Sequence, residues 1–512
     1  MARPPFSIEK CIADLIVYAK SHLDLDDLDA VYAQNRLLRL FGATEPQEPT
    51  GKQRDLQTDL LDPMVRYAVK NKLTDEASAL LFETEIMGLV TPAPSYVVSR
   101  FDNIAAVESP QKATDYLYDL SVNSNYIRMA DIRKNIRWTA PGTMGDITVT
   151  INLSKPEKDA KQVALEKAMA ATNYPKCALC IENVGFAGNV KRAARQTLRT
   201  IPIILGDEEW FFQFSPYVYY DNHCIAFSKE HRPMAVTPKT FTRLLDFCDL
   251  FPYYFIGSNA DLPIVGGSIL SHDHYQGGNK VLPMFRRDAR KVFAHPTFPN
   301  TQFAILDWYN SVVRLSSFNR AELEKAAAHV LQHWRVYTDQ TVGVIARTDE
   351  PHNTVTPIAT YDKQHGYVIY LILRNNRTDD KHPDGIFHPT ADMHNIKKEG
   401  IGLIEAMGIF ILPGRLAAET EAIVNILTGA APLDFSALSK EDNPLGKHLG
   451  MIAQLTNDCG TSLSPEAAER AVVDYINNTC VKILECTAVF KNTEEGQQAF
   501  EKFLKEVGAY KE

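Results

Sequence analysis

The stretch "GGSILSHDHYQGG", residues 266–278, places two histidines and a glutamine at alternate positions between paired glycines. In an extended strand successive side chains point to opposite faces, so His272, His274 and Gln276 would share one face, with the intervening residues behind them. Two histidines on a solvated strand face need no function. The rest of the sequence therefore has to decide between that interpretation and a chemical site.

Composition and charge narrow the class of protein. The chain has 512 residues, 45% of them hydrophobic and 23% charged, which predicts a globular protein of two to four domains. Its formal charge is 54 − 63 = −9, with no run of five or six basic residues. This disfavours the alternative of a zinc-stabilised nucleic-acid-binding module, because binding to a phosphate backbone needs a basic surface. A small anionic ligand needs only a few cationic groups.

Cysteine content and the N-terminal sequence indicate the cellular compartment in which the protein is expected. Eight cysteines in a chain of this length are no disulfide framework. The N-terminal residues carry charges too early for a signal peptide, and no stretch of about 18 uncharged apolar residues predicts a membrane span. We therefore expect a cytoplasmic protein with reduced thiols that are free to bind metal.

Hydrophobic periodicity changes along the chain. Residues 7–41 and 74–90 have apolar positions at helical spacing, so the first hundred or so residues predict mainly helices. From about residue 140 the pattern becomes that of strands. Residues 145–154 alternate, and the aromatic-rich stretch 209–228 predicts two strands around Ser215-Pro216.

Helix and strand signals continue into the C-terminal half. Residues 236–251 predict a helix with Thr237 as N-cap and Pro238 at the first helical position. Its apolar face would consist of Phe241, Leu244, Leu245 and Cys248. Residues 352–376 predict paired strands, and 395–419 predict mixed structure. Ser464-Pro465 would begin a long helical tail.

The motif "YPKCALC" raises the question of a metal site. Cys177 and Cys180 are a redox pair, half of a metal site, or two ordinary cysteines. The following "IENVGFAGN" is a poor helix, which disfavours a thioredoxin-like motif. A zinc site would need two further ligands, from His223, His231 or His272. His231 is the better third ligand because it follows a strand expected beside the cysteines, and His223 is the reserve.

Three blocks of sequence resemble a known family. They are "GSNADLPIVGGSILSHDHYQGG" (257–278), "PHNTVTPIA" (351–359) and "NIKKEGIGLIEAMGIFILPGRL" (395–416). Together with "RQTLRTIPIILGDEEWFFQFSPYVYY" (195–220), they resemble the second class of galactose-1-phosphate uridylyltransferases. These are hexose-1-phosphate uridylyltransferases of the histidine-triad superfamily. The resemblance covers nearly the whole chain.

The resemblance implies a fold and a domain organisation. We expect an α+β protein of two histidine-triad-like halves, built on antiparallel sheet with flanking helices. A helical N-terminal extension, residues 1–139, would precede them. The N-terminal half, residues 140–300, would carry zinc and the nucleophile, and residues 301–512 would form the C-terminal half with the helical tail.

Two catalytic roles follow from the same resemblance. The first class of the family carries H-P-H-x-Q, whereas this chain has Asp273 in place of the proline. The match implies that His274 is the nucleophile and that Gln276 contacts a phosphoryl oxygen. Superfamily hydrolases carry histidine at the glutamine position. A neutral amide cannot act as an ionisable acid or base for hydrolysis, so the sequence favours transfer.

The resemblance also completes the zinc site. It implies Cys177, Cys180, His231 and His272 as ligands, the same third ligand that the strand pattern favours. Four protein ligands leave no position open for substrate, so the zinc would be structural and would fix the strand that bears the nucleophile. The first class has an additional metal site whose ligands we do not place in this sequence.

The expected substrate contacts come from several separate segments of the chain. The glycines that flank the histidines let backbone approach a diphosphate closely, although they could also mark ordinary turns. The family pattern suggests lysines after the 145–154 strand as phosphate contacts, an asparagine as nucleotide contact, and a charged pair near residue 400. The expected substrate-binding residues are Asn259, Gly266, Gly267, Lys155, Lys158, Lys398 and Glu405.

The resulting expectation is an enzyme of galactose metabolism. It would transfer uridylyl from UDP-glucose to galactose 1-phosphate by a ping-pong mechanism, through a uridylyl-histidine at His274. The other ring nitrogen of His274 would need an acceptor, for which a backbone carbonyl is the usual candidate. The alternative is a UTP-dependent hexose-1-phosphate uridylyltransferase, or a nucleotide phosphorylase, on the same scaffold. Family resemblance suggests a homodimer.

Overall fold

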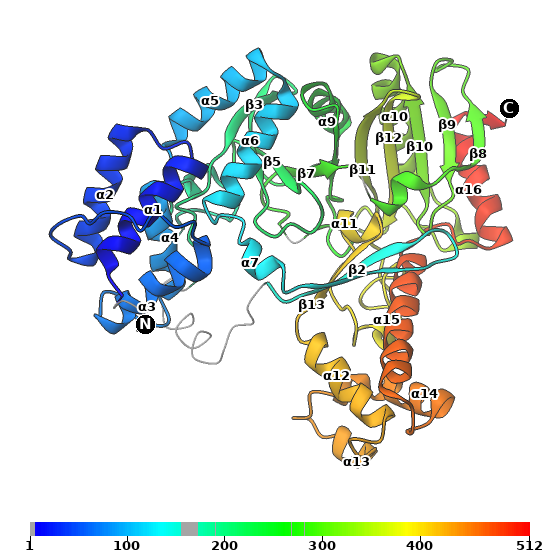
Figure 1. The fold of residues 1–512 in the computed structure, drawn as a ribbon. Helices are drawn as coiled ribbons and strands as arrows, with labels where there is room; N and C mark the ends of the chain where they lie inside the picture. Colours follow the sequence, from blue (N-terminus) through cyan, green and yellow to red (C-terminus); the bar gives the residue numbers. More distant parts are fainter. Residues whose placement is uncertain (1–5, 155–172, 190, 268, 281, 512) are drawn as a thin grey trace. The chain divides into compact units, whose positions relative to one another are not determined.

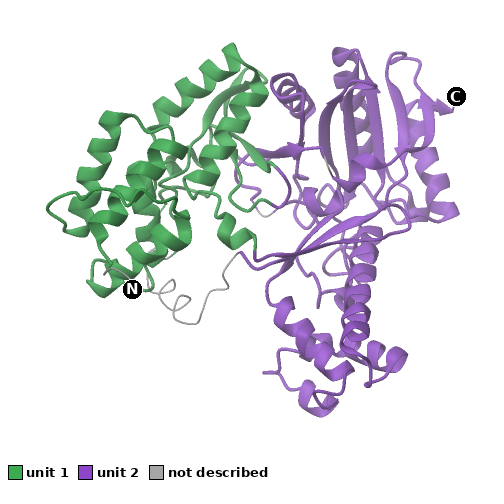
Figure 2. Cartoon of the chain, viewed as in Figure 1, with its two compact units in different colours: residues 1–133, 157–218, 222–232 green, residues 134–156, 219–221, 233–512 purple. Residues whose placement is uncertain are grey.

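The computed structural model describes residues 6–154, 173–189, 191–267, 269–280 and 282–511 (Figure 1). The chain forms two compact units (Figure 2). The first consists of residues 1–133, 157–218 and 222–232, and the second of residues 134–156, 219–221 and 233–512. The division into three parts that the sequence suggests stays a prediction.

Helices form the N-terminal part of the first unit. They are α1 (Ile8–His22), α2 (Asp27–Phe41), the π-helix η1 (Leu56–Leu61), α3 (Asp62–Lys70), α4 (Ala79–Val90), α5 (Pro94–Val107), α6 (Pro110–Asn123) and α7 (Met129–Ile132). The expected helical stretch 7–41 is confirmed as two helices, which begin at the side-chain caps Ser7 and Asp26. Helix α4 begins later than predicted because Asp75 forms a turn by accepting from the Ser78 amide at 2.8 Å.

The described residues of the first unit also form antiparallel strands. They are β3 (Ile201–Leu205), β4 (Glu208–Phe214) and β5 (Cys224–Ser228), in the order β5-β4-β3. The two strands predicted around Ser215-Pro216 are confirmed as β4 and β5. The short 3-10 helix η2 (Ile181–Asn183) follows Cys180, so this segment forms only a single turn.

The second unit is built on a larger antiparallel sheet. Its strands are β6 (Tyr254–Ser258), β7 (His274–Asn279), β8 (Ala289–Ala294), β9 (Gln302–Leu306), β10 (Val312–Ser317), β11 (Asn353–Asp362), β12 (Gly366–Asn375) and β14 (Tyr510–Lys511). Their order is β14-β8-β9-β10-β12-β11-β6-β7. The paired strands predicted at 352–376 are β11 and β12, which pair along their full length. Short 3-10 helices lie at η3 (Pro283–Arg286), η4 (Gln340–Val342) and η5 (Ala391–Met393).

Two helices pack against this sheet, α9 (Pro238–Leu250) and α10 (Arg320–Val336) (Figure 1). The predicted start of α9 is confirmed: Thr237 is the N-cap, Pro238 is the first helical residue, and the Thr237 amide donates to Thr240 Oγ1 at 2.9 Å. The predicted apolar face of α9 is buried. Alternate residues of β12, Tyr370 among them, belong to a core that includes Leu403 and Phe410.

A small sheet and a helical tail complete the second unit. Strands β1 (Ile136–Ala140) and β2 (Ile147–Asn152) pair antiparallel, and β13 (Ile409–Pro413) adds to β2 in parallel. The helices are α11 (Leu403–Ala406), α12 (Leu416–Leu427), α13 (Phe435–Leu438), η6 (Gly446–His448), α14 (Leu449–Cys459), α15 (Pro465–Thr487) and α16 (Glu494–Val507). Helix α15 begins at Pro465, as the sequence predicts, and Ser464 caps it by accepting from the Ala467 amide.

The secondary structure confirms the expected α+β class. Antiparallel pairing dominates both units, and flanking helices cover the sheet of the second unit. Among the described residues, no helix combines the length and the apolar character that crossing a bilayer requires.

Candidate functional site

Strand β7 presents the predicted nucleophile. It begins at His274 and pairs with β6, so that Gln276 lies opposite Gly257. Position 257 needs glycine because a Cβ there would lie 2.9 Å from side-chain atoms of Ile358 and Leu403. His272 lies just before the strand and is fully buried, and His274 is 5% exposed. The expected alternation therefore holds for His274 and Gln276.

The imidazole of His274 is held by a backbone carbonyl. Its Nδ1 atom lies 2.8 Å from the carbonyl oxygen of His272. A carbonyl can only accept, so Nδ1 carries the hydrogen and Nε2 keeps its lone pair. Burial lowers the pKa of His274 to about 4, so the ring is neutral at neutral pH. The arrangement gives a neutral imidazole in the tautomer that a nucleophilic Nε2 requires.

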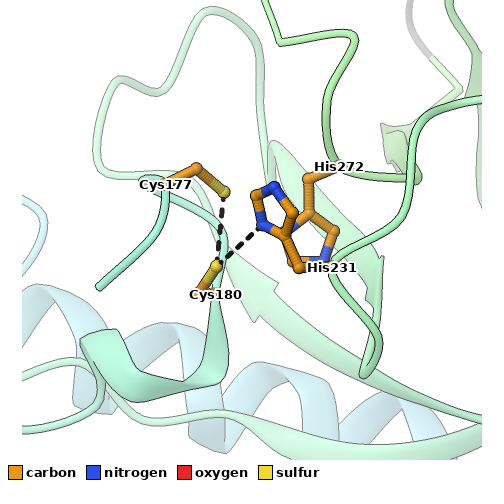
Figure 3. A group of neighbouring side chains, drawn as sticks. All are labelled: Cys177, Cys180, His231 and His272. Atoms are coloured by element: carbon orange, nitrogen blue, oxygen red, sulfur yellow. Dashed lines mark hydrogen bonds between the residues drawn. The ribbon is translucent and has the colours of Figure 1, made fainter. Parts of the chain in front are cut away.

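The predicted metal ligands come together. Cys177, Cys180, His231 and His272 each offer one ligand atom, and these atoms all lie within 4.8 Å of one another (Figure 3). The two sulfur atoms are 3.5 Å apart, and Cys180 Sγ lies 3.1 Å from Nδ1 of His231. Zn–S bonds of about 2.3 Å and Zn–N bonds of about 2.0 Å place neighbouring ligand atoms on the order of 3.5 Å apart. This donor set therefore fits a tetrahedral zinc ion.

The reserve ligand His223 lies outside this cluster. Its side chain is buried, and its carbonyl accepts a hydrogen bond from the Ser215 amide at 2.8 Å. The structure thus favours His231, the ligand preferred from the strand pattern.

Asn259 occupies a tightly packed position after β6. The side chain is 5% exposed, and its Oδ1 accepts from the Leu403 amide at 2.9 Å. A Cβ at Gly267 would lie 2.5 Å from Asn259 Nδ2, and a Cβ at Gly266 would lie 2.7 Å from the Ala260 carbonyl oxygen. A side chain at position 266 would therefore clash with backbone, and one at position 267 would displace the amide of Asn259. The contacts expected between them and a diphosphate stay a prediction.

Two of the predicted substrate contacts lie near residue 400, and two lie outside the described residues. Glu405 forms an ion pair with Lys397, 2.9 Å between Oε1 and Nζ, whereas Lys398 is exposed. Lys155 and Lys158 fall in the part of the chain that the structure does not describe.

Sequence reasoning missed two buried cations in this region. Lys397 is 5% exposed, and Arg374 is 2% exposed and donates to the Ile401 carbonyl at 2.6 Å. Both hold the segment that carries Leu403. A charged residue inside an apolar run, as in "YLILRNN" (370–376), is the signal that would have indicated Arg374, because a buried charge needs a specific partner.

A cavity of about 860 Å³ elsewhere in the second unit contains none of the predicted site residues. Its charged lining groups are Arg137, Asp146, Asp221, Arg286 and Arg287. Arg287 pairs with Asp307, and the two lining carboxylates offset the remaining guanidinium charge. No histidine or cysteine lies among the described lining residues, so the chemistry points to β7 and not to this cavity.

Comparison with known proteins agrees with the geometry. Residues 23–233 match the family model of the galactose-1-phosphate uridyl transferase N-terminal domain, and residues 248–428 match that of the C-terminal domain. A galactose-1-phosphate uridylyltransferase of Caldanaerobacter subterraneus is 45% identical over 98% of both chains, and one of Bacillus subtilis is 43% identical over the same shares.

A solved structure of yeast Ap4A phosphorylase matches more distantly. It is 13% identical, with a TM-score of 0.32, over 60% of this chain and 88% of that one, a likeness too low to support an argument about fold or function. The two family models, and the relatives that match nearly the full length of the chain, identify its family. The chain belongs to the galactose-1-phosphate uridylyltransferase family.

Proposed function

We propose that this protein transfers the uridylyl group of UDP-glucose to galactose 1-phosphate through a covalent intermediate on His274. The proposal rests on one observation above all, the contact between Nδ1 of His274 and the His272 carbonyl. That contact leaves Nε2 as an available nucleophile in a buried, neutral ring. Membership of the family supports the substrate class.

The first half-reaction forms the intermediate. Nε2 of His274 attacks the α-phosphorus of UDP-glucose, and a P–N bond forms as the P–O bond to the β-phosphate breaks. The electron pair of the broken bond leaves with the oxygen of glucose 1-phosphate. The ring gains positive charge, which the Nδ1–H bond to the His272 carbonyl stabilises. No proton has to move at this ring.

The second half-reaction reverses the chemistry with a different acceptor. A phosphate oxygen of galactose 1-phosphate attacks the same phosphorus, the P–N bond breaks, and its electron pair returns to Nε2. The two anionic sugar phosphates therefore never have to occupy the site together, which is the advantage of a ping-pong route. The amide of Gln276, two residues along β7, donates to a phosphoryl oxygen in both steps without titrating.

A zinc ion on Cys177, Cys180, His231 and His272 is part of the proposal. The donor set fits it, and a closed set of four ligands leaves no coordination position for substrate. When bound, zinc would supply structural rigidity. His272 would then contribute in two ways, as a ligand through its ring and as the acceptor for His274 through its carbonyl.

The substrate contacts and the cellular setting also belong to the proposal. Asn259, Gly266, Gly267, Lys398 and Glu405 would bind the nucleotide and the sugar phosphates, with Lys155 and Lys158 on the phosphates. We expect a homodimer from family resemblance. A cytoplasmic location agrees with the eight cysteines, none of which forms a disulfide.

Intact mass spectrometry tests donor and nucleophile together. The protein is incubated with UDP-glucose alone, and we expect one uridylyl group per chain. The adduct should be absent in His274→Asn. His295→Asn is the matched control, because His295 is equally buried, at 4% exposed, but directly follows β8, which five other strands of the sheet separate from β7. A full-strength adduct on His274→Asn would refute the assignment.

The same experiment separates the alternative activities. With UTP as donor, an adduct that UDP-glucose does not give would indicate a UTP-dependent enzyme. Release of the adduct by inorganic phosphate, but not by galactose 1-phosphate, would indicate a phosphorylase. We expect galactose 1-phosphate to release it as UDP-galactose.

A further inference from the structure

The residue between the two histidines is charged and buried. Asp273 is 3% exposed, and its Oδ2 lies 3.6 Å from Nη1 of Arg243, which is 6% exposed. Arg243 comes from α9, the helix that packs against β6 and β11. Burying two charges is unfavourable unless they are paired, so an ion pair at this place indicates a specific requirement.

Tyr275 faces the same helix. Arg243 and Thr240, both on α9, approach its hydroxyl, and the side chain is 1% exposed. Tyr275 alternates with His274 and Gln276 along β7 and so lies on the opposite face, and Asp273 is held to the same helix by its ion pair with Arg243. Helix α9 thus supports the back of the segment whose front carries the nucleophile.

The contacts between α9 and Asp273 bear directly on the His272 carbonyl, which accepts the hydrogen bond from His274. The carbonyl of His272 belongs to the planar peptide unit that ends at the Cα atom of Asp273. Rotation of that unit would move the carbonyl oxygen away from Nδ1 of His274, from which it now lies 2.8 Å. A side chain that fixes Asp273 therefore fixes the direction of the carbonyl, and with it the tautomer and orientation of the imidazole.

We propose that Arg243, through Asp273 and Tyr275, is a positioning residue that aligns His274 for uridylyl transfer. This inference rests on the proposed function. Arg243 pairs with Asp273, and it acts by holding the back of this segment against α9. Loss of the alignment should slow the covalent step more than it weakens substrate binding, since a misplacement of about 1 Å can lower a rate about 100-fold.

The test compares two ion pairs of α9. The double variant R243M/D273N removes both buried charges, so neither is left unpaired. The matched control, D246N/R320M, removes the charges of Asp246 on α9 and Arg320 on α10, which pair the two helices with each other and not with β7. For each protein we would measure the single-turnover rate of uridylylation at saturating UDP-glucose, the KM for UDP-glucose, the zinc content and the melting temperature.

We expect R243M/D273N to lose at least about tenfold in the uridylylation rate, with KM and zinc content near wild type. The uridylylation rate of D246N/R320M should stay within about twofold of the wild-type rate. A rate for R243M/D273N equal to that of the control would overturn the inference and leave the proposed function intact. A wild-type protein that never acquires uridylyl would instead overturn the proposed function.

A conservative variant keeps the inference testable if the double variant does not fold. Arg243→Lys retains the positive charge but loses the guanidinium fork, so it should give a rate between those of wild type and an unaligned site. A ¹⁵N NMR spectrum of the histidine rings should show His274 losing part of its Nδ1–H population in Arg243→Lys. An unchanged rate together with an unchanged tautomer would overturn the inference.

Discussion

The carboxylate of Glu405 lies 2.9 Å from the ammonium group of Lys397, and both side chains are largely buried. Burial alone would lower the pKa of Lys397, but the carboxylate of Glu405 more than offsets this and raises it. The ion pair joins the two ends of the segment 397–405, and within this segment the Leu403 amide donates to Asn259 Oδ1. The arrangement of Asn259 therefore depends on a charge pair that the sequence does not reveal.

Glu405→Gln should destabilise the protein strongly. It leaves the ammonium of Lys397 buried without its carboxylate, and breaking a buried pair in this way costs about 3–5 kcal/mol. Urea unfolding at neutral pH would measure the change in the free energy of unfolding. Lys398→Ala is the control, since Lys398 is exposed and its loss should change stability by less than about 0.5 kcal/mol. A comparable loss in both variants would contradict the prediction.

Gly267→Ala should disturb Asn259. The added Cβ would lie 2.5 Å from Asn259 Nδ2, so the amide has to shift, and its bond to the Leu403 amide weakens. We expect a loss of about 1–3 kcal/mol in stability and a higher KM for UDP-glucose. Gly450→Ala, in α14, is the control because nothing lies within 4 Å of its added Cβ. Equal stability of the two variants would show that the loop accommodates the methyl group.

The covalent step should be insensitive to pH across the range in which a free histidine titrates. Burial lowers the pKa of His274 from 6.5 to about 4, so protonation removes the Nε2 lone pair only near pH 4. We expect the single-turnover rate of uridylylation at saturating UDP-glucose to stay flat from pH 8 to about 5 and to fall below that. A midpoint near 6.5 would mean that the ring is solvated in the working enzyme.

The lowered pKa of His274 also makes the free energy of unfolding depend on pH. Between pH 6.5 and about 4 the unfolded chain binds a proton at this ring and the folded protein does not. The contribution of His274 to the free energy of unfolding therefore falls as the pH falls through this window, and it is constant below it. His274→Asn should show a shallower loss of stability over the window than wild type.

Zinc should bind in a ratio of one ion per chain. Metal analysis of the purified protein would give the ratio, and removal by a chelator should lower the melting temperature by at least a few degrees, because the four ligands are then no longer held together. Cys177→Ser should weaken zinc binding, whereas Cys459→Ser should not, since Cys459 is an exposed thiol outside the cluster. Full activity and stability without metal would disprove the zinc assignment.

Local chemistry explains what the sequence could predict. The starts of α9 and α15 follow from Thr237-Pro238 and Ser464-Pro465, because a cap and a proline act within one turn. The strands β11 and β12 follow from a long run of β-branched and aromatic residues. The third metal ligand follows from a strand that ends beside the cysteine pair.

Other features depend on contacts between distant segments. Which carbonyl accepts from His274 depends on the turn before β7, and a sequence pattern does not specify the direction of one peptide unit. Lys397 and Lys398 are neighbours of the same type in an irregular segment, where no period indicates which one points inward. The partner of Asp273 lies 30 positions earlier, on a helix whose apolar face was the predicted feature.

Thr240 belongs both to the first turn of α9 and to the surroundings of Tyr275. A protein engineer who wished to transplant residues 266–278 into another scaffold would therefore need to move the helix with the loop. The smallest portable module is the histidine-bearing strand with the helix behind it. A graft of the histidines alone would supply the imidazole groups without the contacts that orient them.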